Sequence, residues 1–206
     1  MASRNILKLG ALDAKKTAFL LCDLQETFRR HIKQFGEVVK VANKMMVASK
    51  HLEIPVYISE QYRKGLGPTT KDIKVEDAKF LYEKTSFSMY TPELKAKLAQ
   101  DVPELSSVVL FGIEAHVCVE QTVIDLLNED IVVHLLADGV SSRSFMDREL
   151  ALQRFQKMGC FVSTSENVLF KLLKDKNHPQ FKVISKLMVE PTPDTFSSGT
   201  LMNGKL

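Results

Sequence analysis

The sequence predicts a doubly wound, three-layer α/β fold built on a parallel sheet. Short runs of apolar residues alternate along the chain with longer segments whose apolar residues recur at helical spacing. Strands that are apolar throughout are typical of a parallel sheet covered by helices on both faces. A chain of 206 residues is long enough for one domain with its own core. In such folds ligands bind at the carboxyl ends of the strands, where the strand order reverses.

Six segments are predicted as strands because they are short, apolar and bounded by charged or turn-forming residues. These segments are 17–23, 54–60, the first part of 79–88, 107–112, 131–138 and 160–164. Pro55 is compatible with the second strand because it stands at its beginning, where a missing backbone donor is tolerated.

The segments between the strands predict helices. In 35–52, Phe35, Val38 and Met45 are among the apolar residues at helical spacing. The other predicted helices are 91–99, 117–129, 145–159, a helix from 166, and 178–188. Thr91 followed by Pro92 is a typical helix start, Gly159 a typical end, and Ser165 is expected to cap the helix from 166. Residues 61–70 predict a loop, 14–190 form the predicted domain, and 191–206 are expected to be a mobile tail.

Composition and charge are typical of a soluble globular protein, with 45% hydrophobic residues, 26% charged residues and a net charge of +3. The basic residues are spread along the chain without an RNA-binding motif, so no nucleic-acid partner is expected. No run approaches the ~18 apolar residues of a membrane span. Because no secretory signal is evident, we expect a cytoplasmic protein. A mitochondrial presequence and the peroxisomal address that the final "GKL" echoes stay open.

Reactive side chains stand at the ends of several predicted strands. In chain order they are Asp23, Glu60 with Gln61, Lys84 after Glu83, Cys118, and Asp138. The three cysteines include no C-x-x-C pair and predict no disulfide framework; Cys22 and Cys160 are expected to be inert core thiols. The five histidines never pair at metal-ligand spacing, and no glycine-rich phosphate loop follows the first strand. We therefore expect neither metal nor cofactor.

Cys118 is expected on the first turn of a helix that follows a buried strand. The thiolate is the nucleophilic form of cysteine, and a helix N-terminus and a nearby lysine both stabilise it. Lys84 could supply that charge, while Asp23 could take the proton and hold the ammonium group. Taken one at a time, each residue is better explained as core, cap or surface. The functional interpretation depends on their meeting at one edge of the sheet.

Three segments resemble the signature segments of the isochorismatase-like cysteine hydrolases: "FLLCDLQETF", "YEKTSFS" and "LFGIEAHVCVEQT". They occur in the family's order, and the resemblance is greatest to the eukaryotic isochorismatase domain-containing proteins. It implies a Rossmann-like six-stranded sheet of order 3-2-1-4-5-6 and a catalytic triad of Asp23, Lys84 and Cys118. It also implies an oxyanion hole of the Glu114 and Cys118 backbone N–H groups, a cis peptide between Ile113 and Glu114, and a homo-oligomer, a dimer or larger.

The implied reaction is hydrolysis of a small amide, imide or related non-peptide C–N bond through a thioester. The resemblance points to a substrate pocket formed by Gln25, Phe28, Tyr62, Phe87 and Ile113, although Phe28 and Phe87 are equally plausible in the core. The metal-binding histidines of the nicotinamidase branch are absent from 59–70.

Several alternatives stay open. His116 is expected to face solvent, and the segment 141–144 ("SSRS") could reach the site, contact a neighbouring subunit or form a plain turn. A non-enzymatic interaction protein with a vestigial triad is the main alternative function. A nucleic-acid-binding or ribonuclease-like role is less favoured.

Overall fold

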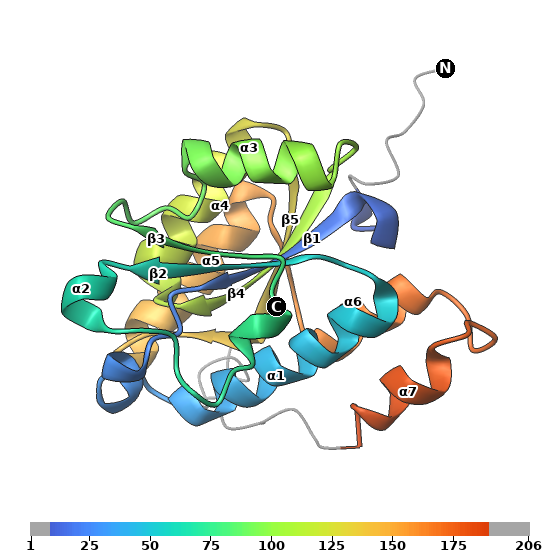
Figure 1. Ribbon diagram of the computed structural model, residues 1–206, viewed down its shortest axis with the longest axis horizontal. Coiled ribbons are helices and arrows are strands. Elements are labelled where there is room, and N and C mark those ends of the chain that lie inside the picture. Colours follow the sequence, from blue (N-terminus) through green and yellow to red (C-terminus); the bar gives the residue numbers. More distant parts are fainter. Residues whose placement is uncertain (1–8, 190–206) are drawn as a thin grey trace, which may run out of the picture.

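The computed structural model describes residues 9–189 and contains a six-stranded sheet in which every strand is parallel to its neighbours (Figure 1). The order β3-β2-β1-β4-β5-β6 confirms the prediction. The strands are β1 (Thr17–Cys22), β2 (Val56–Gln61), β3 (Phe80–Lys84), β4 (Ser107–Ile113), β5 (Val132–Ser141) and β6 (Phe161–Ser163). Strand order reverses between β1 and β4, so a crevice is expected at their carboxyl ends.

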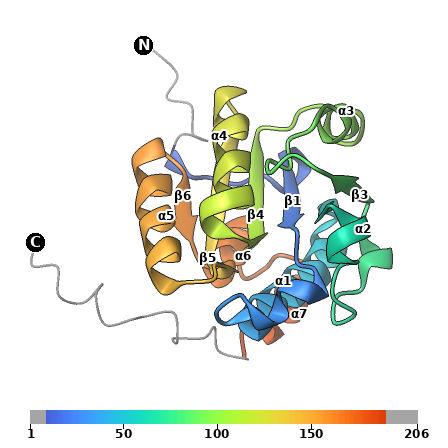
Figure 2. The same ribbon diagram turned by 90° about the vertical axis from the view of Figure 1, so that its left-hand side faces the viewer.

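Helices cover both faces of the sheet. They are α1 (Phe35–Leu52), α2 (Arg63–Leu66), α3 (Pro92–Asp101), α4 (Glu120–Asn128), α5 (Phe145–Met158), α6 (Ser165–Leu173) and α7 (Phe181–Lys186). The first face carries α1, α6 and α7, and the second carries α3, α4 and α5 (Figure 2). Successive side chains of β1 alternate between the two apolar clusters: Phe19 and Leu21 join the first, and Leu20 and Cys22 join the second.

Two predicted boundaries are wrong. Thr164, not Ser165, caps α6, because its hydroxyl accepts a hydrogen bond from the Asn167 N–H. β5 does not end at Asp138 but continues to Ser141. The Asp138 carboxylate is buried and accepts hydrogen bonds from the Ser165 N–H and hydroxyl. Asp138 was predicted to mark the end of the strand, but its side chain instead connects β5 to α6.

Smaller differences occur elsewhere. The predicted loop 61–70 contains the one-turn helix α2, and the last predicted helix is limited to 181–186. The predicted tail, 191–206, lies outside the described residues. Within residues 9–189, no helix has both the length and the apolar character needed to cross a membrane.

Gly112 allows β1 and β4 to approach closely at their carboxyl ends. It pairs with Cys22, and its φ of +120° is one that L-residues rarely adopt. A Cβ at this position would lie 2.2 Å from the Cys22 carbonyl oxygen. Both strands are buried here, so neither backbone can move aside easily.

We therefore expect Gly112→Ala to lower the free energy of unfolding by about 3 kcal/mol, measured by urea denaturation. Gly36→Ala is the matched control, because a Cβ at Gly36 in α1 would meet no atom within 4 Å apart from its chain neighbours and the backbone of its own helix. Its effect should stay within about 1 kcal/mol. Equal stability of the two variants would contradict the close-approach explanation.

His134 of β5 is a buried histidine whose two ring nitrogens have no hydrogen-bond partner among residues 9–189. The ring stacks on Phe161, with 5.1 Å between ring centroids. Burial, assisted by the charge of Lys171, lowers the pKa of His134 to about 4. The folded protein therefore keeps this imidazole neutral at pH values where the unfolded chain protonates it.

This difference predicts an acid-dependent loss of stability. Below the ordinary pKa of 6.5 the unfolded chain binds a proton that the folded chain refuses, so stability should fall until pH approaches 4, by up to about 3 kcal/mol. Comparing urea denaturation at pH 7 and pH 5, we expect His134→Leu to reduce this loss. The control is His31→Leu, at an exposed position, which should leave the loss unchanged. An unchanged loss in His134→Leu would show that other groups cause it.

Candidate active site

A buried ion pair joins the ends of β1 and β3. Lys84, the last residue of β3, places its Nζ atom 2.7 Å from Oδ2 of Asp23, which directly follows β1. The two side chains are only 1% and 2% exposed. From β2, which lies between these strands, Ser59 donates a 2.6 Å hydrogen bond to the other carboxylate oxygen of Asp23. Both carboxylate oxygens are thus held.

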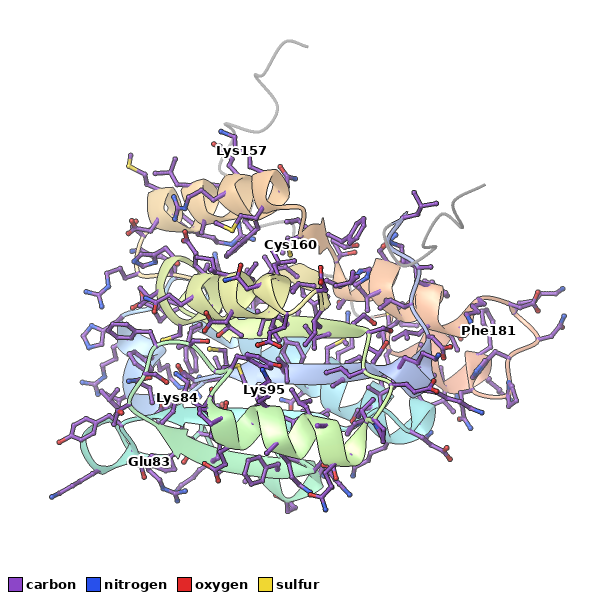
Figure 3. The ribbon with its side chains drawn as sticks, turned by 90° about the horizontal axis from the view of Figure 1, so that it is seen from above. Glu83, Lys84, Lys95, Lys157, Cys160 and Phe181 are labelled. Carbon is purple, nitrogen blue, oxygen red and sulfur yellow. The ribbon has the colours of Figure 1, made fainter. Side chains whose placement is uncertain are left out.

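The loop after β3 surrounds the Lys84 ammonium group. Besides Asp23, Nζ has acceptors in Oε1 of Gln61 at 2.7 Å and in the carbonyl oxygens of Ser86 at 3.1 Å and Phe87 at 2.9 Å. Figure 3 marks Lys84 beside Glu83; in β3, Lys84 is buried and Glu83 is exposed. An ammonium with three N–H groups and four nearby acceptors is held in one place.

The charge of this ammonium is preserved by its neighbours. Burial alone would lower the pKa of Lys84, but Cys22, Asp23 and Cys118 together hold it above its ordinary value. The ion pair and the two cysteines therefore form one electrostatic cluster at the carboxyl ends of β1, β3 and β4.

Cys118 lies on a π-helical turn, Ala115–Val119, between β4 and α4. The expected start of an α-helix at this point is wrong by a few residues: the Val119 N–H bonds to the Glu114 carbonyl, five residues earlier, and α4 begins only at Glu120. Single π-helical turns frequently occur at functional sites. The Thr122 hydroxyl donates to the Cys118 carbonyl at 2.6 Å and accepts from the Met89 N–H, so the turn is tied to the loop that follows Lys84.

Cys22 lies beside Cys118. All three cysteines are free and buried, as expected for Cys22 and Cys160. Burial raises the pKa of the Cys22 thiol well above its ordinary value, and a hydrogen bond with Cys118 raises it further, whereas the charge of Lys84 acts in the opposite direction. Cys22 is the last residue of β1, the strand next to β4, and immediately precedes Asp23, but its position in the sequence does not by itself predict a contact with Cys118.

The segment 141–144 holds the turn that carries Cys118. Arg143 donates to the Glu114 carboxylate through its backbone N–H at 3.0 Å and its guanidinium at 3.2 Å. His116 is half-buried rather than solvent-facing, and its Nδ1 lies 2.9 Å from the Ser142 hydroxyl oxygen. The peptide bond between Ile113 and Glu114 is cis. The segment was expected to reach the site, to contact a neighbouring subunit or to form a plain turn. Within this single chain it reaches the site.

The five expected pocket residues occupy different environments. Gln25 is buried, and its amide group is bound to the backbone of Gln61 and Gly67, so it holds the 61–67 segment. Ile113 is buried within the first apolar cluster, and Phe28 is partly buried against the same cluster. Tyr62 and Phe87 are each half exposed, and both belong to the segments that hold Lys84. A role in substrate binding stays a prediction for all five.

Two further observations concern what this site could bind. Among residues 9–189, no group of three or more His, Cys, Asp or Glu side chains could hold a metal ion. A cavity of about 550 Å³ opens between the end of β3 and the start of α3, lined by residues that include Lys84, Thr85 and Glu93. Cys118 is not among its lining residues, so the buried ion pair and thiols indicate the reactive centre better than this cavity does.

Comparisons with known proteins identify the family of this chain. The family model of the isochorismatase domain matches residues 17–167. Isochorismatase domain-containing protein 2 of Xenopus laevis is 47% identical over 191 residues, 93% of this chain and 92% of that protein. Its human namesake is 44% identical over 187 residues, 91% of this chain and 90% of that protein.

Solved structures extend the comparison. A structure named MAR1 ribonuclease from Caenorhabditis elegans superposes with a TM-score of 0.84 at 38% identity and covers 90% of this chain and 95% of its own. The ycaC gene product of Escherichia coli, described as an octameric hydrolase of unknown specificity, gives a TM-score of 0.78 at 18% identity over 86% of this chain and 89% of its own, a likeness of fold alone. The family model and the relatives together establish that this chain belongs to the isochorismatase family.

Proposed function

We propose that this protein is a cofactor-free cysteine hydrolase that cleaves a C–N bond in a small amide, imide or related molecule. The observation that carries the proposal is the Lys84–Asp23 ion pair, which is almost fully buried and adjoins the thiols of Cys118 and Cys22. Removing two charges from water costs several kcal/mol per ion, so a buried pair is a poor source of stability. Such a pair beside a thiol is better explained by catalysis.

In the first step of the proposed mechanism, Asp23 removes the proton of Cys118. Its carboxylate is held by Lys84 and Ser59, which fixes its position for accepting the proton. The thiolate then attacks the carbonyl carbon of the substrate, and the carbonyl π electrons move onto oxygen. Lys84 remains an ammonium group and stabilises negative charge throughout this step.

The tetrahedral intermediate next collapses to a thioester. Its oxyanion would be stabilised by the backbone N–H groups of Glu114 and Cys118. The Glu114 side chain is fixed by Arg143, which supports this assignment because a preorganised donor needs a rigid backbone. The leaving nitrogen takes the proton from Asp23. Water, deprotonated by Asp23, then cleaves the thioester and releases an acid and the free thiol.

The substrate is proposed to be small because Cys118 itself is only 7% exposed. Tyr62 and Phe87 are the aromatic residues best placed to meet it, since both are half exposed on segments that contact Lys84. Gln25 is proposed to contribute indirectly, because its amide holds the backbone of the 61–67 segment. A homo-oligomer is part of the proposal; the ycaC gene product of Escherichia coli, which shares the fold, is described as octameric.

A ribonuclease is the second candidate, favoured by the name of the 38% identical structure from Caenorhabditis elegans. RNA binding would show as an affinity that falls steeply with salt. The two candidates differ in their dependence on the thiol, because the proposed hydrolase mechanism fails without Cys118.

Thiol labelling tests whether Cys118 is activated. At neutral pH, iodoacetamide should modify Cys118 at least roughly tenfold faster than Cys160 or Cys22, measured by mass spectrometry of digested samples. Cys160 is the internal control, because its 5% exposure resembles the 7% of Cys118 while burial raises its pKa to about 12. Equal rates would argue against an activated thiol.

A charge-neutral pair of substitutions completes this test. The double variant Asp23→Asn/Lys84→Met leaves no unpaired buried charge, so it should fold where either single change could leave an uncompensated ion. We expect its Cys118 labelling rate to fall towards that of Cys160. An unchanged rate would show that the ion pair does not activate the thiol.

A substrate screen tests the function itself. Wild-type protein and Cys118→Ser are compared on small amides, imides and esters and on RNA, with Cys160→Ser as the matched control. We expect hydrolysis of at least one small amide or imide, a loss of roughly 10³-fold or more in Cys118→Ser, and full activity in Cys160→Ser. RNA cleavage that persists in Cys118→Ser would instead support the ribonuclease candidate.

A further inference from the structure

The proposed reaction leaves two buried thiols unused, and one of them, Cys22, immediately precedes Asp23. It is the last residue of β1, and its side chain shares a face of the sheet with Ala18 and Leu20. The apolar cluster on that face also contains Cys118. Because side chains alternate along a strand, Cys22 is directed toward the layer in which Cys118 lies, and Leu21 is directed away from it.

The strand register places Cys22 against the strand that leads into the turn carrying Cys118. Cys22 pairs with Gly112 of β4, and the missing side chain of Gly112 lets the two backbones nearly touch. From Gly112 the chain passes through Glu114 into the π-helical turn, and Cys118 on this turn joins the apolar cluster that contains Cys22. Both thiols belong to the same apolar cluster, at the carboxyl-end side of neighbouring strands, and Lys84 interacts electrostatically with both.

We infer that Cys22 and Cys118 form an intramolecular disulfide after a hydroperoxide oxidises Cys118. In the first step the Cys118 thiolate attacks one oxygen of the hydroperoxide, an S–O bond forms, and the O–O bond breaks. The alcohol, or water, leaves with the proton that Cys118 lost. In the second step the Cys22 sulfur attacks the Cys118 sulfenic acid, an S–S bond forms, and the hydroxyl group leaves as water with the Cys22 proton. Two thiols lose two electrons and the hydroperoxide gains them.

The two thiols differ in the way that this order of events requires. Cys118 is 7% exposed and Cys22 is 0% exposed, so a small peroxide meets Cys118 first. Burial raises the pKa of Cys22, which makes it a poor primary target but leaves it available to a sulfenic acid that forms beside it. Asp23 is adjacent to accept its proton, and Lys84 stabilises the thiolate that results.

Cys160 does not compete for Cys118. It contacts the Val133 carbonyl through a 3.3 Å hydrogen bond and lies close to α5, away from Lys84 (Figure 3). The disulfide would block Cys118 reversibly and protect it from irreversible oxidation to sulfinic acid, and a dithiol would restore it. The inference needs only the thiol pair, so it holds whether or not Cys118 attacks a carbonyl.

The test uses the full-length reduced protein and hydrogen peroxide. After a short exposure at neutral pH, N-ethylmaleimide blocks the remaining thiols, and a non-reducing tryptic digest is analysed by mass spectrometry. The cysteines fall in separate tryptic peptides, 17–29, 98–143 and 158–171. We expect loss of both free thiols of the pair, a cross-link between the first two peptides, and recovery of both thiols with dithiothreitol.

Variants separate this result from non-specific oxidation. In Cys22→Ser and Cys22→Ala, Cys118 should accumulate as sulfinic acid, whereas Cys160→Ser should behave as wild type. The two Cys22 variants are compared with wild type by circular dichroism, and the wild-type cross-link itself remains decisive if they fold poorly. Sulfinic acid at Cys118 in wild type, a cross-link to the peptide 158–171, or a cross-link between chains would overturn the inference.

Discussion

The buried ion pair between Lys84 and Asp23 is the constraint on which the rest of the site depends. Two charged side chains that are almost fully buried need hydrogen-bond partners inside the protein, and each of the two has them. Ser59 from β2 bonds to the carboxylate, while Gln61 and the loop after β3 surround the ammonium. Residues of three strands and one loop thus contact this single ion pair.

The need to hold the ion pair explains why polar side chains such as Gln25 and Thr122 are buried beside an apolar sheet. Gln25 binds the backbone of Gln61, which is the last residue of β2 and a partner of Lys84, and the backbone of Gly67 beyond it. On the other side, Thr122 connects the loop after β3 to the turn that carries Cys118. The parallel order of the strands places all of these groups at one edge, around the ion pair.

Several contacts also fix the turn between β4 and α4. Arg143 and Ser142 reach it from the end of β5, and Gly112 lets β4 lie against β1 just before the turn begins. The same close approach brings Cys22 beside Cys118. One packing detail therefore serves both the position of the proposed nucleophile and its contact with a second thiol. By contrast, the buried ring of His134 packs on Phe161, and its nitrogens have no hydrogen-bond partner in the part of the chain from 9 to 189.

The sequence by itself determined the fold class, the six strands and most helices, because hydrophobic periodicity and end signals are local properties. Together with the family's signature segments it also singled out Asp23, Lys84 and Cys118. It could not determine that β5 passes Asp138, since the partner that satisfies this carboxylate, Ser165, lies 27 residues away. Nor could it reveal the Cys22–Cys118 contact or the hydrogen bonds between the Gln25 amide and the backbone of Gln61 and Gly67. Those depend on strand register and side-chain direction across the sheet, which only tertiary packing decides.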